Sequence, residues 1–128
     1  MSVRPLLAID WGTTNRRVYR IEDGAVTATE RDALGVTAVS DFAGELAAIR
    51  ARFGDLPVLM AGMVGSTIGW REARYVPAPA GLEDLGQNLL RIDERTAIVP
   101  GVSFSDGVRG ECHVTGEVGR AAPPALAA

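Results

Sequence analysis

The first part of the chain alternates between apolar runs and short polar turns, which predicts three strands. The run PLLAIDWG is typical of a buried strand that ends at Asp10. The segment RRVYRIEDG predicts a second strand, and its Asp23-Gly24 pair marks a tight hairpin turn. The segment AVTATERDALGV can supply the third strand. Short turns join all three, so we expect an antiparallel meander.

The period then changes to that of a helix. In SDFAGELAAIRARFG the apolar residues recur at helical spacing, with Ser40 or Asp41 as N-cap and Gly54 as stop. LPVLMAGMVGS predicts another buried strand, GLEDLGQNLLRI a second amphipathic helix and TAIVPGVSF a last short strand. A third helix could begin in DGVRGECHVTGEV, but the glycines of this segment make that prediction weak.

The resulting order, β-β-β-α-β-α-β, predicts an α/β fold with a mixed sheet. An antiparallel meander would be extended by parallel strands through crossover helices, and the helices would pack on the sheet. This order matches a ribonuclease-H-like half-domain. We expect one domain over residues 1–118, followed by a loose Ala/Pro-rich tail over residues 119–128.

Composition narrows the function classes. The 128 residues suit one domain, and 47% of them are hydrophobic, as in soluble globular proteins. The net charge is −3 and all thirteen basic residues are arginine, so we expect neither nucleic acid nor a membrane as partner. No apolar run approaches the ~20 residues of a membrane span, which makes the cytoplasm the expected compartment. One cysteine, Cys112, with one histidine, His113, excludes a disulfide framework and cannot alone close a zinc site.

The turn DWGTTN is the first candidate site. Its carboxylate stands at the end of a buried strand, and the glycine turn beyond it can bring magnesium and phosphate oxygens side by side. Asp10 would hold the metal, while Thr13, Thr14 and Asn15 would donate hydrogen bonds to phosphate. Without a base these side chains are poor nucleophiles, which favours binding over covalent catalysis. The alternative is an ordinary hairpin turn that caps its own backbone.

Two further segments carry candidate chemistry. In MAGMVGSTIGWREARYVPAPAG, glycines after a strand allow close ligand approach, and the arginines that follow could bind an acidic small molecule. A surface loop with solvated charges is the alternative. In SFSDGVRGECH, Asp106 and Glu111 could act as bases and Arg109 could bind an anion. A capped helix start explains the same residues.

Together, AIDWGTTNRR, PVLMAGMVGSTIGWREARYVPAPA and IVPGVSFSDGVRGE resemble the N-terminal part of the 2-dehydro-3-deoxygalactonokinase family. These sugar-acid kinases belong to the superfamily of actin, the hexokinases and the heat-shock chaperone ATPases. The resemblance covers residues 6 to about 118. It implies phosphoryl transfer from ATP, with Mg²⁺, to the 6-hydroxyl of 2-dehydro-3-deoxy-D-galactonate in galactonate breakdown.

The resemblance also implies roles for individual residues. Asp10 would be both the magnesium ligand and a catalytic residue. The ATP-binding residues would be Asp10, Gly12, Thr13, Thr14 and Asn15. Asp106 would be the catalytic base, with Glu111 as the second choice. The implied substrate-binding residues are Arg17, Gly62, Met63, Ser66, Trp70, Arg71, Tyr75 and Arg109.

The sequence departs from the family at two places. Arg16 stands where the family has an apolar residue, and the family's RGEET appears as the RGECH of residues 109–113, so the second acid is lost.

Members of this superfamily carry a second lobe with a further phosphate loop and the adenosine pocket, and the chain ends before any such segment. We therefore expect an N-terminal lobe, inactive alone, with the sugar acid and ATP as small-molecule partners. Its further partner would be a missing C-terminal lobe or a second copy of the chain in a homo-oligomer. The alternative is a non-catalytic remnant that binds the sugar acid or oligomerises. A bare structural domain would leave the three segments unexplained.

Overall fold

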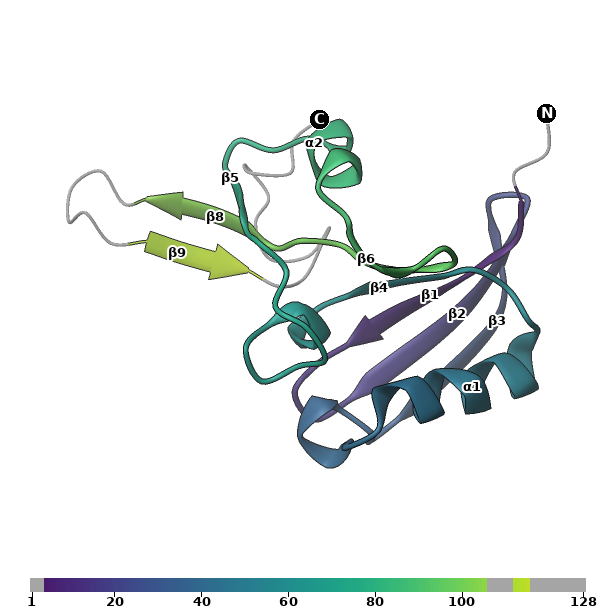
Figure 1. Ribbon diagram of the computed structural model, residues 1–128. Helices are drawn as coiled ribbons and strands as arrows, with labels where there is room; N and C mark the ends of the chain where they lie inside the picture. The colour runs from purple at the N-terminus through teal and green to yellow at the C-terminus, as the bar shows by residue number, and fades with distance from the viewer. Residues whose placement is uncertain (1–3, 106–111, 116–128) are drawn as a thin grey trace.

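The computed structural model describes residues 4–105 and 112–115 (Figure 1). The predicted meander is confirmed: β1 (Leu6–Trp11), β2 (Arg16–Glu22) and β3 (Ala25–Asp32) pair in antiparallel order. The tight turn between β2 and β3 is also confirmed. Asp23 and Gly24 both have positive φ, at 51° and 78°, as a two-residue hairpin turn that follows the strand twist requires.

The helix α1 (Phe42–Phe53) follows the 3₁₀ turn η1 (Val36–Ala38). Of the two candidate caps, Asp41 is the one that accepts a hydrogen bond, from the Gly44 amide at 2.9 Å. Gly54 ends the helix as predicted, with φ 122°. The helix lies across one face of the sheet, and it buries Leu46 and Ile49 against that face (Figure 1).

The strand β4 (Val58–Ala61) runs parallel to β1, and β7 (Thr96–Ile98) runs parallel to β4. The edge strand β6 (Leu90–Asp93) is antiparallel to β7. The six-stranded sheet therefore has the order β3-β2-β1-β4-β7-β6. A meander extended on the β1 side by two parallel strands is the ribonuclease-H-like half-domain that the sequence predicts, so the fold class is confirmed.

The second half of the chain departs from the predicted elements. The helix expected over residues 81–92 is only α2 (Leu82–Gln87), because residues 90–93 pair with β7 instead. A short turn joins these residues to β7, and in it the Arg95 amide donates to the Asp93 carboxylate at 2.8 Å. Because the turn is short, closing it costs little conformational entropy. The long amphipathic helix predicted here is therefore wrong.

The strand expected over TAIVPGVSF is split between two sheets. Pro100 follows β7, and because proline has no N–H it cannot continue a strand ladder. The next strand, β8 (Val102–Ser105), belongs to a second sheet with β5 (Val76–Pro77) and β9 (Cys112–Thr115). Since residues 112–115 form a strand antiparallel to β8, a helix there is also wrong.

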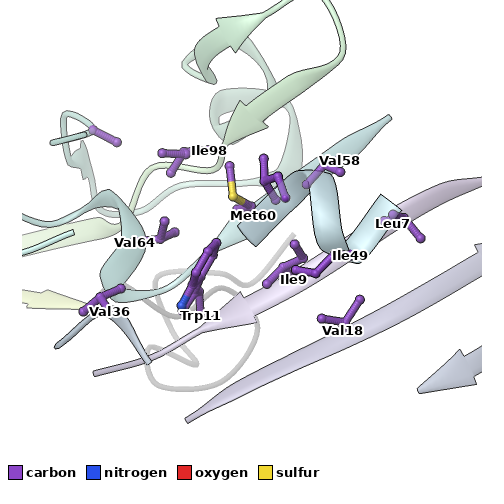
Figure 2. Close-up of a cluster of buried hydrophobic side chains, with 12 residues drawn as sticks. Leu7, Ile9, Trp11, Val18, Val36, Ile49, Val58, Met60, Val64 and Ile98 are labelled. Carbon is purple, nitrogen blue, oxygen red and sulfur yellow. The ribbon is translucent and has the colours of Figure 1, made fainter. Parts of the chain in front are cut away.

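The main core lies between the sheet and α1. Figure 2 shows the cluster, in which side chains of β1 and β4 lie together with Ile49 of α1, Val36 of η1 and Val64 after β4. Its largest member is Trp11, at the end of β1, which is fully buried. The indole nitrogen of Trp11 donates to the Leu34 carbonyl at 2.9 Å, so its polar atom is satisfied. The turn after β1 thus starts from one of the most tightly packed residues of the chain.

Candidate functional site

The turn between β1 and β2 is held from one side by the segment around η1. The carbonyl oxygens of Gly12, Thr13 and Thr14 accept hydrogen bonds from three successive amides of that segment. The donors are Val36, Thr37 and Gly35, at 2.9, 3.2 and 3.2 Å respectively. The Thr37 hydroxyl adds a second bond to the Thr13 carbonyl at 2.9 Å. The carbonyls of Gly12, Thr13 and Thr14 are therefore directed toward η1, whereas the Asn15 carbonyl accepts from the Gly12 amide at 2.9 Å.

The same geometry directs the amides of the turn away from η1. In a peptide plane the N–H and C=O groups point in opposite directions. The amides that share peptide planes with these carbonyls belong to Thr13, Thr14 and Asn15. Within residues 4–105 and 112–115, none of these three amides donates to a protein atom. Consecutive backbone N–H groups left open in a turn form a recess suited to an anion.

Gly35 is what permits this close approach. A Cβ at Gly35 would lie 2.3 Å from the Thr13 carbonyl oxygen and 2.4 Å from the Thr14 nitrogen, so no side chain fits there. Sequence reasoning did not identify Gly35, since its constraint comes from a contact with the turn more than twenty positions earlier. The requirement for glycine here is steric, and it does not depend on an unusual φ.

A pocket of about 320 Å³ opens at the turn. Its lining residues come from β1, the turn, β2 and β3: Asp10, Gly12, Thr13, Thr14, Asn15, Arg17 and Arg31. The structure thus brings the predicted phosphate-loop residues together with Arg17 in one pocket. Arg31 was not foreseen. The pocket combines open backbone amides, hydroxyls and two guanidinium groups with a single carboxylate, a set that favours an anion accompanied by a metal ion.

Asp10 stands where three chain segments meet. It pairs with Arg17 on β2 and with Ala61 on β4, and the turn after β4 begins at Gly62. Gly62 has φ 100°, and a Cβ there would lie 2.7 Å from the Trp11 carbonyl oxygen and 3.3 Å from Asp10 Oδ1. Glycine at 62 therefore lets the turn after β4 approach the carboxylate closely.

Arg16 is a structural anchor beside the turn. Its side chain is 1% exposed and contacts Asp32 at 2.7 Å and Glu45 at 2.8 Å. Burial would lower the pKa of Arg16, but the hydrogen bonds and charges of the two carboxylates raise it above its ordinary value. The charged guanidinium thus ties β2 to the end of β3 and to α1.

Comparison with known proteins decides the family. The family model for 2-keto-3-deoxy-galactonokinase matches residues 10–120. This chain belongs to that family. Two curated relatives agree: Probable 2-dehydro-3-deoxygalactonokinase DgoK1 of Rhizobium meliloti (strain 1021), 38% identical over 109 residues, and 2-dehydro-3-deoxygalactonokinase of Escherichia coli (strain K12), 34% identical over 103 residues. Each alignment covers 77% of this chain and 35% of the relative.

A solved structure supports the same assignment. The crystal structure of a Sinorhizobium meliloti protein assigned as a 2-dehydro-3-deoxygalactonokinase superposes with a TM-score of 0.75 at 32% identity. The alignment covers 87% of this chain and 40% of that protein. The chain corresponds to the N-terminal part of the galactonokinase family and spans about a third of the length of its curated relatives.

The segment predicted for the substrate side of this galactonokinase-family lobe lies at the same end of the sheet, after β4 (Figure 1). It includes the 3₁₀ turn η2 (Met63–Gly65), and Met63 packs against the main core. The Ser66 hydroxyl donates to the Met63 carbonyl at 2.6 Å, and the Trp70 ring stacks on Phe42 with centroids 5.9 Å apart. Arg71 and Tyr75 are exposed. None of these residues lines the 320 Å³ pocket, so the structure does not bring them to the turn.

The remaining predicted residues, Asp106, Arg109 and Glu111, lie outside the described residues. Within residues 4–105 and 112–115, no three His, Cys, Asp or Glu side chains gather as a metal-binding cluster. Mg²⁺ is commonly held by one or two carboxylates together with phosphate oxygens and water, so Asp10 and a phosphate fit its needs. In the same part of the chain, no helix is both long and apolar enough to cross a membrane.

Proposed function

We propose that this chain is the phosphate- and sugar-acid-binding lobe of an ATP-dependent kinase. The reaction would be transfer of a phosphoryl group to the 6-hydroxyl of 2-dehydro-3-deoxy-D-galactonate, in the cytoplasm. The observation that carries the proposal is the turn at residues 12–15, in which three successive carbonyls bind the segment around η1 while three successive amides stay open beside Asp10. An anion cradle next to a carboxylate is what a magnesium-bound phosphate requires.

Each group of the pocket has a role in this proposal. The amides of Thr13, Thr14 and Asn15 and the threonine hydroxyls donate to phosphate oxygens, and Asp10 holds Mg²⁺ through coordinated water. The metal supplies neutralisation of the charge that develops during transfer. Because these donors are fixed by η1 before the phosphate arrives, little reorganisation is needed on binding.

The remaining roles are also proposals. Asp106, with Glu111 as the alternative, would take the proton of the sugar hydroxyl. Gly62, Met63, Ser66, Trp70, Arg71, Tyr75 and Arg109 would form the sugar-acid side. The role of Gly62 is supported by its closeness to Asp10, because a Cβ at position 62 would lie 3.3 Å from Asp10 Oδ1. Because the alignments cover only 35% of each curated relative, the adenosine pocket would be supplied by a second lobe.

The test is isothermal titration of the 128-residue chain, separately with magnesium-ATP and with 2-dehydro-3-deoxy-D-galactonate. Asp10→Asn is expected to weaken magnesium-ATP binding at least about tenfold, because it removes the carboxylate that holds the metal. Asp23→Asn is the matched control: it removes the same charge from the hairpin turn at the other end of β2, and asparagine tolerates the positive φ there.

The outcomes separate the two candidate functions. Binding of magnesium-ATP that depends on Asp10 supports the kinase lobe. Binding of the sugar acid without magnesium-ATP would favour the non-catalytic binding protein. Binding of magnesium-ATP to Asp10→Asn as tightly as to the unsubstituted chain would contradict the proposed role of the turn.

A further inference from the structure

Two arginines face each other across β2 and β3 on the pocket side of the sheet. Arg17 and Arg31 are direct partners in the strand register, and both line the pocket at the turn. Within residues 4–105 and 112–115, neither side chain forms a hydrogen bond or an ion pair. Like charges directly opposite each other on neighbouring strands are destabilising. The pair is therefore a cost in the ligand-free fold.

The carboxylates of β3 do not offset this cost, because they lie on the opposite face. Asp32 contacts Arg16, and Glu30 contacts Arg52 of α1 at 2.6 Å. A bulge near Arg20 produces this separation. The register shifts by one residue between Arg20 and Ile21, and Thr27 has no partner residue on β2 in that register. Without that shift Glu30 would stand opposite Arg17, and the two would neutralise each other.

We propose that Arg17 and Arg31 form a two-arginine clamp for an oxyanion that enters the pocket from the β3 side. The ligand chemistry is a carboxylate or phosphate group, whose oxygens match the paired N–H donors of a guanidinium. The clamp rests on the proposed function, since it assigns a second anionic group to the same pocket. It adds Arg31 to that site, and it requires no metal.

The clamp predicts binding in the absence of magnesium. The probes are inorganic pyrophosphate and sodium D-galactonate, titrated into the 128-residue chain in metal-free buffer with EDTA. Arg31→Gln is expected to weaken binding of the clamped anion about tenfold, the loss typical of one charge-assisted hydrogen-bonded pair. Arg91→Gln is the matched control, because Arg91 is an exposed arginine on β6, at the far edge of the sheet.

The two probes distinguish the source of the oxyanion. Weaker pyrophosphate binding alone assigns the clamp to a phosphate of the nucleotide, and weaker galactonate binding alone assigns it to the carboxylate of the sugar acid. An effect on both identifies a general oxyanion site. Unchanged binding of both probes in Arg31→Gln, or no binding of either probe by the unsubstituted chain, overturns the clamp.

Stability gives a second readout that a structural role would not produce. Because Arg31→Gln removes a like-charge contact, the melting temperature of the ligand-free variant should equal or exceed that of the unsubstituted chain. Pyrophosphate or galactonate should raise the melting temperature of the variant less than that of the unsubstituted chain. A variant that melts lower without ligand and shows the same ligand-induced rise would contradict the proposal.

Asp10→Asn separates this inference from the proposed kinase function. It should abolish the gain in affinity that magnesium brings while leaving metal-free binding at the clamp in place. Magnesium-ATP binding that ignores Asp10, together with metal-free binding that depends on Arg31, would refute the kinase lobe and keep the clamp. Magnesium-ATP binding that depends on Asp10, together with metal-free binding that ignores Arg31, would keep the kinase lobe and refute the clamp.

Discussion

The guanidinium carbon of Arg16 lies 5.2 Å from the centroid of the Trp11 ring, so a buried cation packs on the largest aromatic side chain of the core. Trp11 in turn meets Phe42 at the start of α1, with ring centroids also 5.2 Å apart. Trp11 and Arg16 directly flank the turn at residues 12–15. The rigidity of that turn is therefore tied to the packing of the whole β1–β2–α1 corner.

Replacing Arg16 by methionine should lower the free energy of unfolding by about 2 kcal/mol, since two carboxylates lose their counter-ion. The loss stays below the about 3–5 kcal/mol of a fully buried pair because Asp32 and Glu45 remain 24% and 32% exposed. Urea denaturation measures the change. Arg52→Met, which breaks the exposed pair with Glu30, is the control and should cost about 0.5 kcal/mol. Equal losses in the two variants would argue against an anchoring role for Arg16.

Gly35→Ala should disrupt the phosphate turn itself. Its Cβ would overlap the Thr13 carbonyl, so the turn must move or η1 must shift, at a cost of about 1–3 kcal/mol. We expect pyrophosphate binding to fall below detection in titration calorimetry. Gly86→Ala in α2 is the comparison, since its Cβ meets nothing within 4 Å and should add about 0.5–1 kcal/mol of stability. Normal pyrophosphate binding by Gly35→Ala would show that the turn tolerates displacement from η1.

Gly62→Ala should act on the metal ligand more than on the anion cradle. The added methyl group would press on the Trp11 carbonyl and lie beside Asp10 Oδ1, so magnesium-dependent ATP binding should weaken while metal-free pyrophosphate binding is kept. Gly54→Ala imposes similar backbone strain, with φ 122°, at the end of α1. Both variants should lose stability, but only Gly62→Ala should lose the magnesium effect. Loss of that effect in Gly54→Ala as well would point to a global cause.

Acid should weaken the edge of the sheet near Arg95. The side chain of Arg95 lowers the pKa of Asp55 below its ordinary 3.8 through a hydrogen bond and its charge. The Arg95 amide and the Thr96 hydroxyl likewise lower the pKa of Asp93. A lowered folded-state pKa gives stability that is present above about pH 4 and is lost as the pH falls through the folded-state values.

Asp55→Asn and Asp93→Asn should each make the melting temperature less dependent on pH below about pH 4. High salt distinguishes them, because it screens the exposed ion pair of Asp55 while leaving the backbone hydrogen bond of Asp93 largely in place. Differential scanning calorimetry from pH 5 down to pH 2 in low and high salt would test this. An unchanged acid profile in both variants would count against these contacts.

Local signals in the sequence were enough for the N-terminal half. The Asp23-Gly24 turn, the cap at Asp41 and the stop at Gly54 each act within a few residues, so their patterns could be interpreted correctly. The pairing of residues 90–93 with β7 could not be foreseen, because tertiary contacts override the helical period of GLEDLGQNLLRI.

The candidate site divides in the same way. The turn at residues 12–15 is contiguous, and it was identified from six letters of sequence. Arg31 and Gly35 join it only through the strand register and a close contact with the turn. If the residues of β2 and β3 paired one to one from the hairpin turn, Glu30 would stand opposite Arg17. Nothing in the sequence marks Thr27 as the extra residue. The residues that were missed are therefore those that long-range geometry brings in.

The extra residue Thr27 makes the charge of the pocket depend on the pairing of a distant part of the hairpin. A one-residue slip that paired Thr27 with Arg20 would close the bulge and change the partners of residues 28–31. Glu30 would then stand opposite Arg17 in the pocket, and Arg31 would stand opposite Arg16. A slip far from the turn, with no contact to any ligand, would thus convert an anion-attracting pocket into a neutralised one. Within this hairpin, strand pairing is as much a determinant of ligand choice as the identity of the side chains.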